Sequence, residues 1–108
     1  MTGSLQRPSR LDVTWTGDGD HVVVTIVGEV DASNADDLID AIAEGAGTHT
    51  AVRVDMVAVE FMDSSLLRAL LQCQARFARV GVDFKVRNVT PQARRVFAIT
   101  RLESLLEQ

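Results

Sequence analysis

The chain changes from a strand pattern to a helix pattern within one stretch, Phe61-Met62-Asp63-Ser64-Ser65-Leu66-Leu67. Before it, the β-branched and apolar residues 50–54 predict a strand that closes on Asp55, and residues 57–62 continue as an extended or turning connection. After it, apolar residues recur at spacings of three and four as far as residue 78, as on the buried side of an amphipathic helix. A strand followed by a helix in this way is typical of an α/β fold.

Two strands and one helix are predicted upstream of this stretch. Residues 11–15 alternate apolar and polar side chains, and a turn rich in glycine and aspartate joins them to the apolar run 22–27. This pattern predicts a β-hairpin whose first strand lies at an edge of the sheet and whose second lies in its interior. Ser33 as the N-cap and the apolar stripe after it predict a helix that ends at Gly45 or Gly47.

Three more elements are predicted downstream. The helix that begins near Ser64 should stop at Gly81, and the alternating residues 82–86 should form another strand. Thr90 as N-cap with Pro91 at the first helical position predicts a third helix, and the leucines at the end of the chain predict one more short turn.

The order of these elements predicts a single α/β domain over residues 10–108. Strands that alternate with helices imply parallel βαβ units with right-handed crossovers, and this places successive helices on the same face. We therefore predict a mixed four-stranded sheet with an antiparallel N-terminal edge strand and helices packed mainly on one face. Residues 1–9 contain few apolar side chains and are predicted to be a flexible tail.

Composition argues against several functions. The formal net charge is −4, and the 11 Lys and Arg are spread along the chain, whereas direct binding of nucleic acid needs a basic face. No run of about 18 apolar residues is present, so we expect a cytoplasmic protein without membrane insertion. Cys73 is the one cysteine and is predicted to be a core residue, and His21 and His49 are far apart, so we expect no disulfide, metal or cofactor.

Candidate site residues gather at the start of the second helix. Asp63 is a natural N-cap, which places Ser64 and Ser65 at the first, exposed helical positions. A phosphate on Ser64 would be tolerated there, because free N–H groups and the helix dipole favour negative charge. Glu29 and Asp31 leave the neighbouring strand at the same end of the sheet and should form one acidic rim with Asp63. From spacing alone, a simple helix cap remains the competing interpretation.

Four motifs in order resemble the STAS domain family, in particular the antagonists of anti-sigma factors. The resemblance extends over about residues 11–106, and its most specific part is the family's aromatic-hydrophobic-Asp-Ser-Ser signature. The matching segments are Gly28-Glu29-Val30-Asp31, Val52-Arg53-Val54-Asp55, Phe61-Met62-Asp63-Ser64-Ser65, and Val89-Thr90-Pro91 followed by Arg94-Arg95-Val96-Phe97.

The resemblance implies a regulatory cycle without catalysis by the chain itself. In such antagonists the serine after the signature Asp is phosphorylated, which corresponds here to Ser64. The unphosphorylated form binds an anti-sigma factor, often a serine kinase, and so releases a sigma factor for transcription; a phosphatase reverses the modification. The expected docking surface consists of Glu29, Asp31, Asp63, Ser65 and Leu66, on a monomer or weak dimer.

Two positions depart from the family pattern. Leu66 stands where the family commonly has glycine and is expected to add bulk beside Ser64, and Arg101 stands where glycine often separates the last two helices. Leu66 favours an alternative function, a non-phosphorylated STAS interaction subunit such as the cytoplasmic partner of an ABC-type lipid transporter. The intact Asp63-Ser64 pair favours the phosphorylation switch.

An enzyme is not predicted. No serine lies in a Gly-x-Ser-x-Gly elbow, and both histidines should lie at the end of the sheet opposite Ser64. Gly45-Ala46-Gly47 lacks the Lys-Ser/Thr pair of a phosphate-binding loop and follows a helix instead of a strand. We therefore predict no catalytic and no metal-binding residues.

Overall fold

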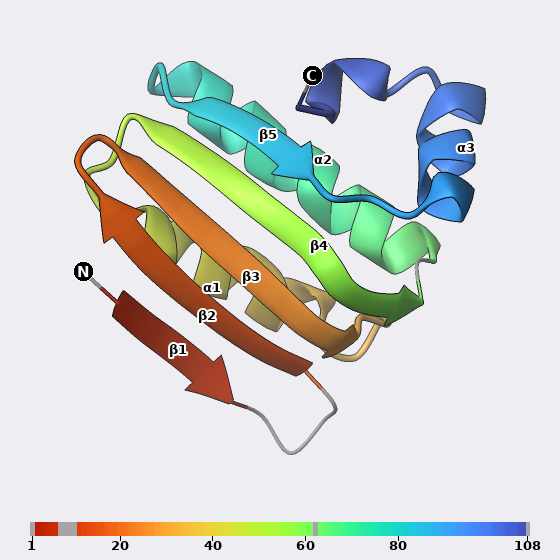
Figure 1. Cartoon of the computed structure of the whole chain (residues 1–108), viewed down its shortest axis with the longest axis horizontal. Helices are drawn as coiled ribbons and strands as arrows, with labels where there is room; N and C mark the ends of the chain where they lie inside the picture. The colour runs from red at the N-terminus through yellow and green to blue at the C-terminus, as the bar shows by residue number, and fades with distance from the viewer. Residues whose placement is uncertain (1, 7–10, 62, 108) are drawn as a thin grey trace.

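A computed structural model of the chain describes residues 2–6, 11–61 and 63–107, and it contains one five-stranded sheet in the order β1-β2-β3-β4-β5 (Figure 1). The first three strands are antiparallel neighbours, whereas β3, β4 and β5 are parallel. The strands are β1 Thr2–Gln6, β2 Leu11–Asp18, β3 His21–Glu29, β4 Ala51–Phe61 and β5 Asp83–Arg87.

The helices follow the predicted order. Helices α1 (Ala35–Ala46) and α2 (Ser64–Arg79) lie side by side behind the sheet. Helix α3 (Pro91–Ile99) lies beyond the end of β5 and leads into a short 3₁₀ helix, η1 (Glu103–Leu105), which returns beside β5 (Figure 1). The α/β class and the mixed sheet with helices on one face are thus confirmed, and the four predicted strands correspond to β2–β5. Strand β4 also includes the predicted connection 57–62 as far as Phe61.

Strand β1 differs from the prediction of a flexible tail over residues 1–9. Thr2–Gln6 pairs antiparallel with β2, so β2 is not an edge strand in this structure. Gly3 pairs with Trp15, and a Cβ atom on Gly3 would overlap the indole ring, so the absence of a side chain leaves the space that the ring fills. Residues 1 and 7–9 of the predicted tail lie outside the described residues.

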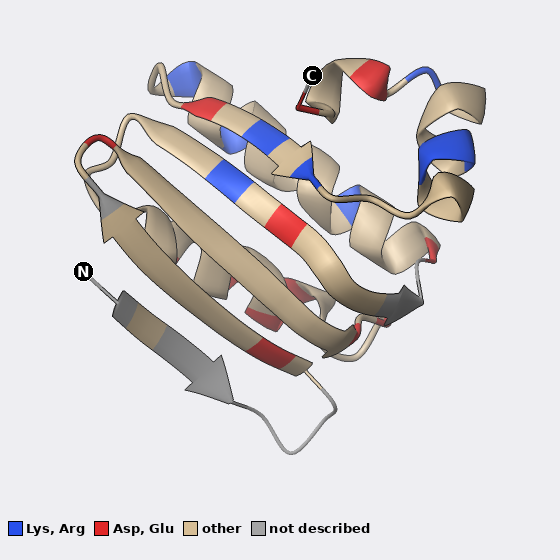
Figure 2. Cartoon of the chain, viewed as in Figure 1, with Lys and Arg blue, Asp and Glu red and all other residues tan. Residues whose placement is uncertain are grey.

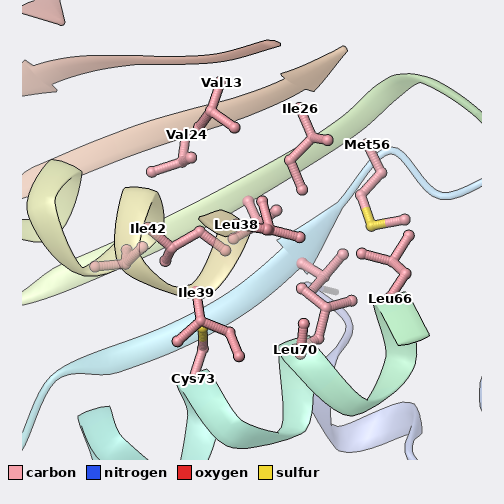
Figure 3. Packing of buried hydrophobic residues seen from close by; sticks show 14 of the residues in the cluster. Val13, Val24, Ile26, Leu38, Ile39, Ile42, Met56, Leu66, Leu70 and Cys73 are labelled. Carbon is pink, nitrogen blue, oxygen red and sulfur yellow. The ribbon is translucent and has the colours of Figure 1, made fainter. Parts of the chain in front are cut away.

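The core lies between the sheet and helices α1 and α2 and is mostly aliphatic, with Trp15, Phe77, Phe84 and Phe97 as its aromatic members. Alternate residues of the central strands point to the helices, and their neighbours point to the open face. Figure 3 shows residues from the strands, α1 and α2 interdigitating in this layer. Cys73 is 1% exposed within it, which confirms the predicted core role, and burial raises the pKa of its thiol to about 12 against the opposing effect of Arg76.

The C-terminal segment is tied back to the sheet by ion pairs. Arg53 donates from Nε to Glu107 at 2.6 Å and from Nη2 to Asp83 at 2.7 Å, and Arg87 donates from Nη2 to the same Glu107 at 3.1 Å. The backbone N–H of Glu107 also donates to the carbonyl of Val86 at 2.8 Å. These contacts extend the sheet beyond β5 by one isolated bridge.

Candidate functional site

Asp63 caps helix α2 as predicted. One carboxylate oxygen, Oδ1, accepts the backbone N–H groups of Ser65 at 2.9 Å and Leu66 at 3.2 Å, and the first helical bond runs from Leu67 N–H to the Asp63 carbonyl. Such a cap contributes about 1 kcal/mol to helix stability. Asp63 therefore fixes the position at which the chain turns from β4 into α2.

Ser64 is the first residue of α2, and its side chain is exposed. Ser65 beside it is half-buried. Asp63 already occupies two N–H groups of this first turn, so these donors are less available to a phosphate than the sequence pattern indicated. The positive end of the helix dipole remains at Ser64, and Arg68 is exposed one turn further on.

Irregular pairing lies between β3 and β4 close to this site. Thr25 pairs with Asp55, but Val27 pairs with Ala58, so β4 carries one extra residue between them, and a second irregularity follows before Glu29 pairs with Phe61. The Asp55 carboxylate accepts the Val57 N–H at 2.9 Å within this bulge. Bulges of this kind re-aim the end of a strand, here the end that leads to Asp63.

The loop from β3 to α1 is held by a buried amide that the sequence pattern did not single out. Asn34 is 2% exposed; its Oδ1 accepts the Asp31 N–H at 2.9 Å, and its Nδ2 donates to the Glu29 carbonyl at 3.1 Å. Asn34, not Ser33, occupies the N-cap position of α1, while the Ser33 N–H donates to the Asp31 carboxylate. The prediction of Ser33 as the N-cap is wrong because its side chain hydrogen-bonds to Asp31 within this turn and not to the start of the helix.

The residues of the predicted acidic rim lie at the carboxyl ends of the central strands β3 and β4. Glu29 and Phe61 are paired at the carboxyl ends of β3 and β4, and Asp31 and Asp63 follow each of them by two residues. Asp31 is exposed, whereas Glu29 and Asp63 are half-buried. Figure 2 shows acidic residues at the end of β3 and at the start of α2.

Leu66 does not belong to this surface. Its side chain is completely buried and points toward Met56 in the core (Figure 3). The predictions that Leu66 adds bulk beside Ser64 and contacts a partner are therefore wrong. The third position of α2 faces the sheet, whereas the first position faces solvent. Within the predicted signature, Met62 lies outside the described residues.

Neither histidine lies near Ser64. His21 pairs with Ala51 at the amino-terminal end of the parallel strands, and the His49 ring makes a 2.9 Å hydrogen bond with the Ala46 carbonyl at that same end. Across residues 2–6, 11–61 and 63–107, no three His, Cys, Asp or Glu side chains are grouped closely enough to hold a metal ion. No helix in that part of the chain has the length and apolar character needed to cross a membrane.

Comparison with known proteins identifies the family. Residues 13–107 match the family described as "Mlab, STAS domain", so the chain belongs to the STAS domain family, whose members are non-catalytic regulatory modules. No curated protein matches the sequence significantly.

Solved structures of anti-sigma factor antagonists share the fold. An antagonist from Mycobacterium paratuberculosis is 28% identical, with a TM-score of 0.78 over 94% of this chain and 87% of that one. The antagonist SpoIIAA in its unphosphorylated form is 22% identical, with a TM-score of 0.70 over 88% and 85% of the two chains. The phosphorylated form of the Bacillus cell fate determinant SpoIIAA is 21% identical, with a TM-score of 0.69 over 88% of each chain.

Proposed function

We propose that this chain is an anti-sigma factor antagonist whose binding is switched off by phosphorylation of Ser64. The observation that carries the proposal is the exposed hydroxyl of Ser64 at the first position of α2, directly after the capping Asp63. The similarity to the antagonist from Mycobacterium paratuberculosis over 94% of the chain supports it. The partner is an anti-sigma factor that also acts as a serine kinase, and a phosphatase restores the binding form.

The switch acts by charge. A phosphate adds about −1.5 to −2 charge at a point that Asp63 and Asp31 already make acidic. Because the Asp63 carboxylate holds the N–H groups of Ser65 and Leu66, the phosphate must compete for them or remain directed to solvent. In either case, a partner that docks over Glu29, Asp31, Asp63 and Ser65 meets a changed surface while the domain itself stays folded.

Modification is tested by incubating the protein with ATP and each anti-sigma kinase of the source organism, followed by intact mass measurement. We expect one added phosphate on the wild type, none on Ser64→Ala, and one on the matched control Ser65→Ala. Failure of every kinase to add a phosphate to the folded wild type would contradict the proposal.

Binding is tested separately by co-purification of the tagged protein with its native partner. We expect Ser64→Ala to retain an anti-sigma factor and Ser64→Asp to lose it, because only the aspartate adds charge at the docking surface. Ser104→Asp is a matched control, since Ser104 is also exposed but lies in η1, away from α2.

A second candidate is a STAS interaction subunit that binds without regulation at Ser64, such as the cytoplasmic partner of an ABC-type lipid transporter. The match of residues 13–107 to the family described as "Mlab, STAS domain" favours it. It predicts that Ser64→Asp leaves partner binding unchanged and that the partner recovered is a transporter component instead of an anti-sigma factor.

A further inference from the structure

Charge is unevenly divided along this chain. Residues 11–50 contain nine Asp and Glu and no Lys or Arg, whereas residues 51–102 contain nine Lys and Arg and four Asp and Glu. The basic residues are therefore concentrated in the second half of the chain, contrary to the even spread inferred from composition. In the fold, the first half supplies α1 and the second supplies α2 and α3, and Figure 2 shows the two signs gathered on different elements.

The division is sharpest on the two helices that cover the sheet. On α1 the outward residues one turn apart are acidic, and on α2 all of the charged residues are basic. All of these side chains are exposed. We call them the acidic stripe, Asp36, Asp40 and Glu44, and the basic stripe, Arg68, Arg76 and Arg79.

Neither stripe forms an ion pair with another of the residues that the structure describes. Among the described residues, the ion pairs join Arg53 and Arg87 to Asp83 and Glu107, and none involves either stripe. The helices themselves pack side by side, and both contribute apolar residues such as Ile39 and Cys73 to the core (Figure 3). The charged stripes are thus left on the solvent side of the helix layer.

We propose that a second copy of this chain docks on the helix layer, with the acidic stripe of each copy against the basic stripe of the other. Both helices return the chain between parallel strands, so they run in the same direction. A two-fold axis parallel to them, lying between the two layers, places α1 of each copy opposite α2 of the other and makes both contacts at once.

The two stripes have matching lengths. Asp36 to Glu44 extends over about 12 Å and Arg68 to Arg79 over about 16 Å at the rise of an α-helix. A contact between exposed charges is weak and strongly screened, so the dimer forms at low ionic strength and dissociates in salt. A second copy is the occupant favoured here because it carries both complementary stripes at the required separation.

Sedimentation velocity over a range of protein concentrations tests the proposal. We expect a dimer at about 0.01 M salt, where the screening length is about 30 Å, and a monomer at about 1 M, where it is about 3 Å. The dissociation constant should rise on the order of tenfold or more across this range. A wild-type protein that stays monomeric at every ionic strength would overturn the proposal and leave these stripes to another partner.

Charge-swap variants test the pairing itself. Asp40→Lys/Glu44→Lys and Arg76→Glu/Arg79→Glu should each be monomeric at low salt, and their equimolar mixture should regain a heterodimer, because the reversed stripes are again complementary. Asp12→Lys/Asp20→Lys changes the net charge as much as the first variant but lies away from the helix layer, and it should still dimerise. A mixture that remains monomeric refutes the stripe-to-stripe contact, provided that circular dichroism shows both variants folded.

Discussion

Replacing Leu66 with alanine should destabilise the domain far more than the same change at its neighbour Leu67. The Leu66 side chain is fully buried, whereas Leu67 is half-buried at the margin of the core. Removing three carbons from the core costs about 2 kcal/mol in transfer free energy, and the cavity left behind adds about 1 to 2 kcal/mol. We therefore expect a loss of about 3 to 4 kcal/mol for Leu66→Ala and about 1 kcal/mol for Leu67→Ala.

Urea unfolding followed by the fluorescence of Trp15, the one tryptophan of the chain, measures this difference. The midpoint for Leu66→Ala should fall on the order of 2 M, with an unchanged dependence on denaturant. Ser64→Ala provides the surface reference and should unfold like the wild type. If Leu66→Ala cost no more than Leu67→Ala, the third position of α2 would not face the core, and the exposed placement of Ser64 at the first position would fail with it.

Three further changes test other parts of the fold. Gly3→Ala should destabilise the domain by about 1 to 3 kcal/mol, because its Cβ would overlap the Trp15 ring; an unchanged melting temperature would show that β1 does not pack there. Arg101→Gly should raise the free energy of unfolding by about 0.5 to 1 kcal/mol, because Arg101 has a φ of 60° at the turn after α3, and a loss of stability in thermal melts would contradict this. Glu107→Gln should flatten the acid limb of the stability curve: burial opposes ionisation, but hydrogen bonds from Arg87 and Arg53 hold the Glu107 pKa below its ordinary value of 4.5. Its contribution is therefore present above that value and lost as pH falls through the lower folded pKa, so identical acid titrations of the two proteins would refute the contribution of the ion pair.

Local patterns predicted most of the elements because each rests on interactions between residues close in sequence. Asp63 and Thr90 cap their helices as expected, because a capping side chain reaches N–H groups two or three residues away. Arg101, which stands where the family often has glycine, adopts the left-handed conformation with a φ of 60°. The order of strands followed from alternation and from the handedness of parallel crossovers.

Strand β1 and the role of Asn34 escaped prediction because their stabilising partners are set by the folded backbone. Thr2–Gln6 gains its structure from backbone pairing with β2, and such pairing leaves little trace in side-chain pattern. Asn34 looks like an ordinary polar residue until the loop closes around it and its amide meets the Glu29 carbonyl and the Asp31 N–H.

Capping and helical periodicity are local, so the sequence alone specifies that Asp63 ends an extended segment and that Ser64 begins a helix. The direction in which each residue of that first turn points depends instead on how α2 packs against the sheet. A helix advances about 100° per residue, so Ser64 faces solvent while Leu66, two residues later, faces the sheet. The same packing places α1 beside α2, and this brings an acidic and a basic stripe from distant parts of the chain onto one surface.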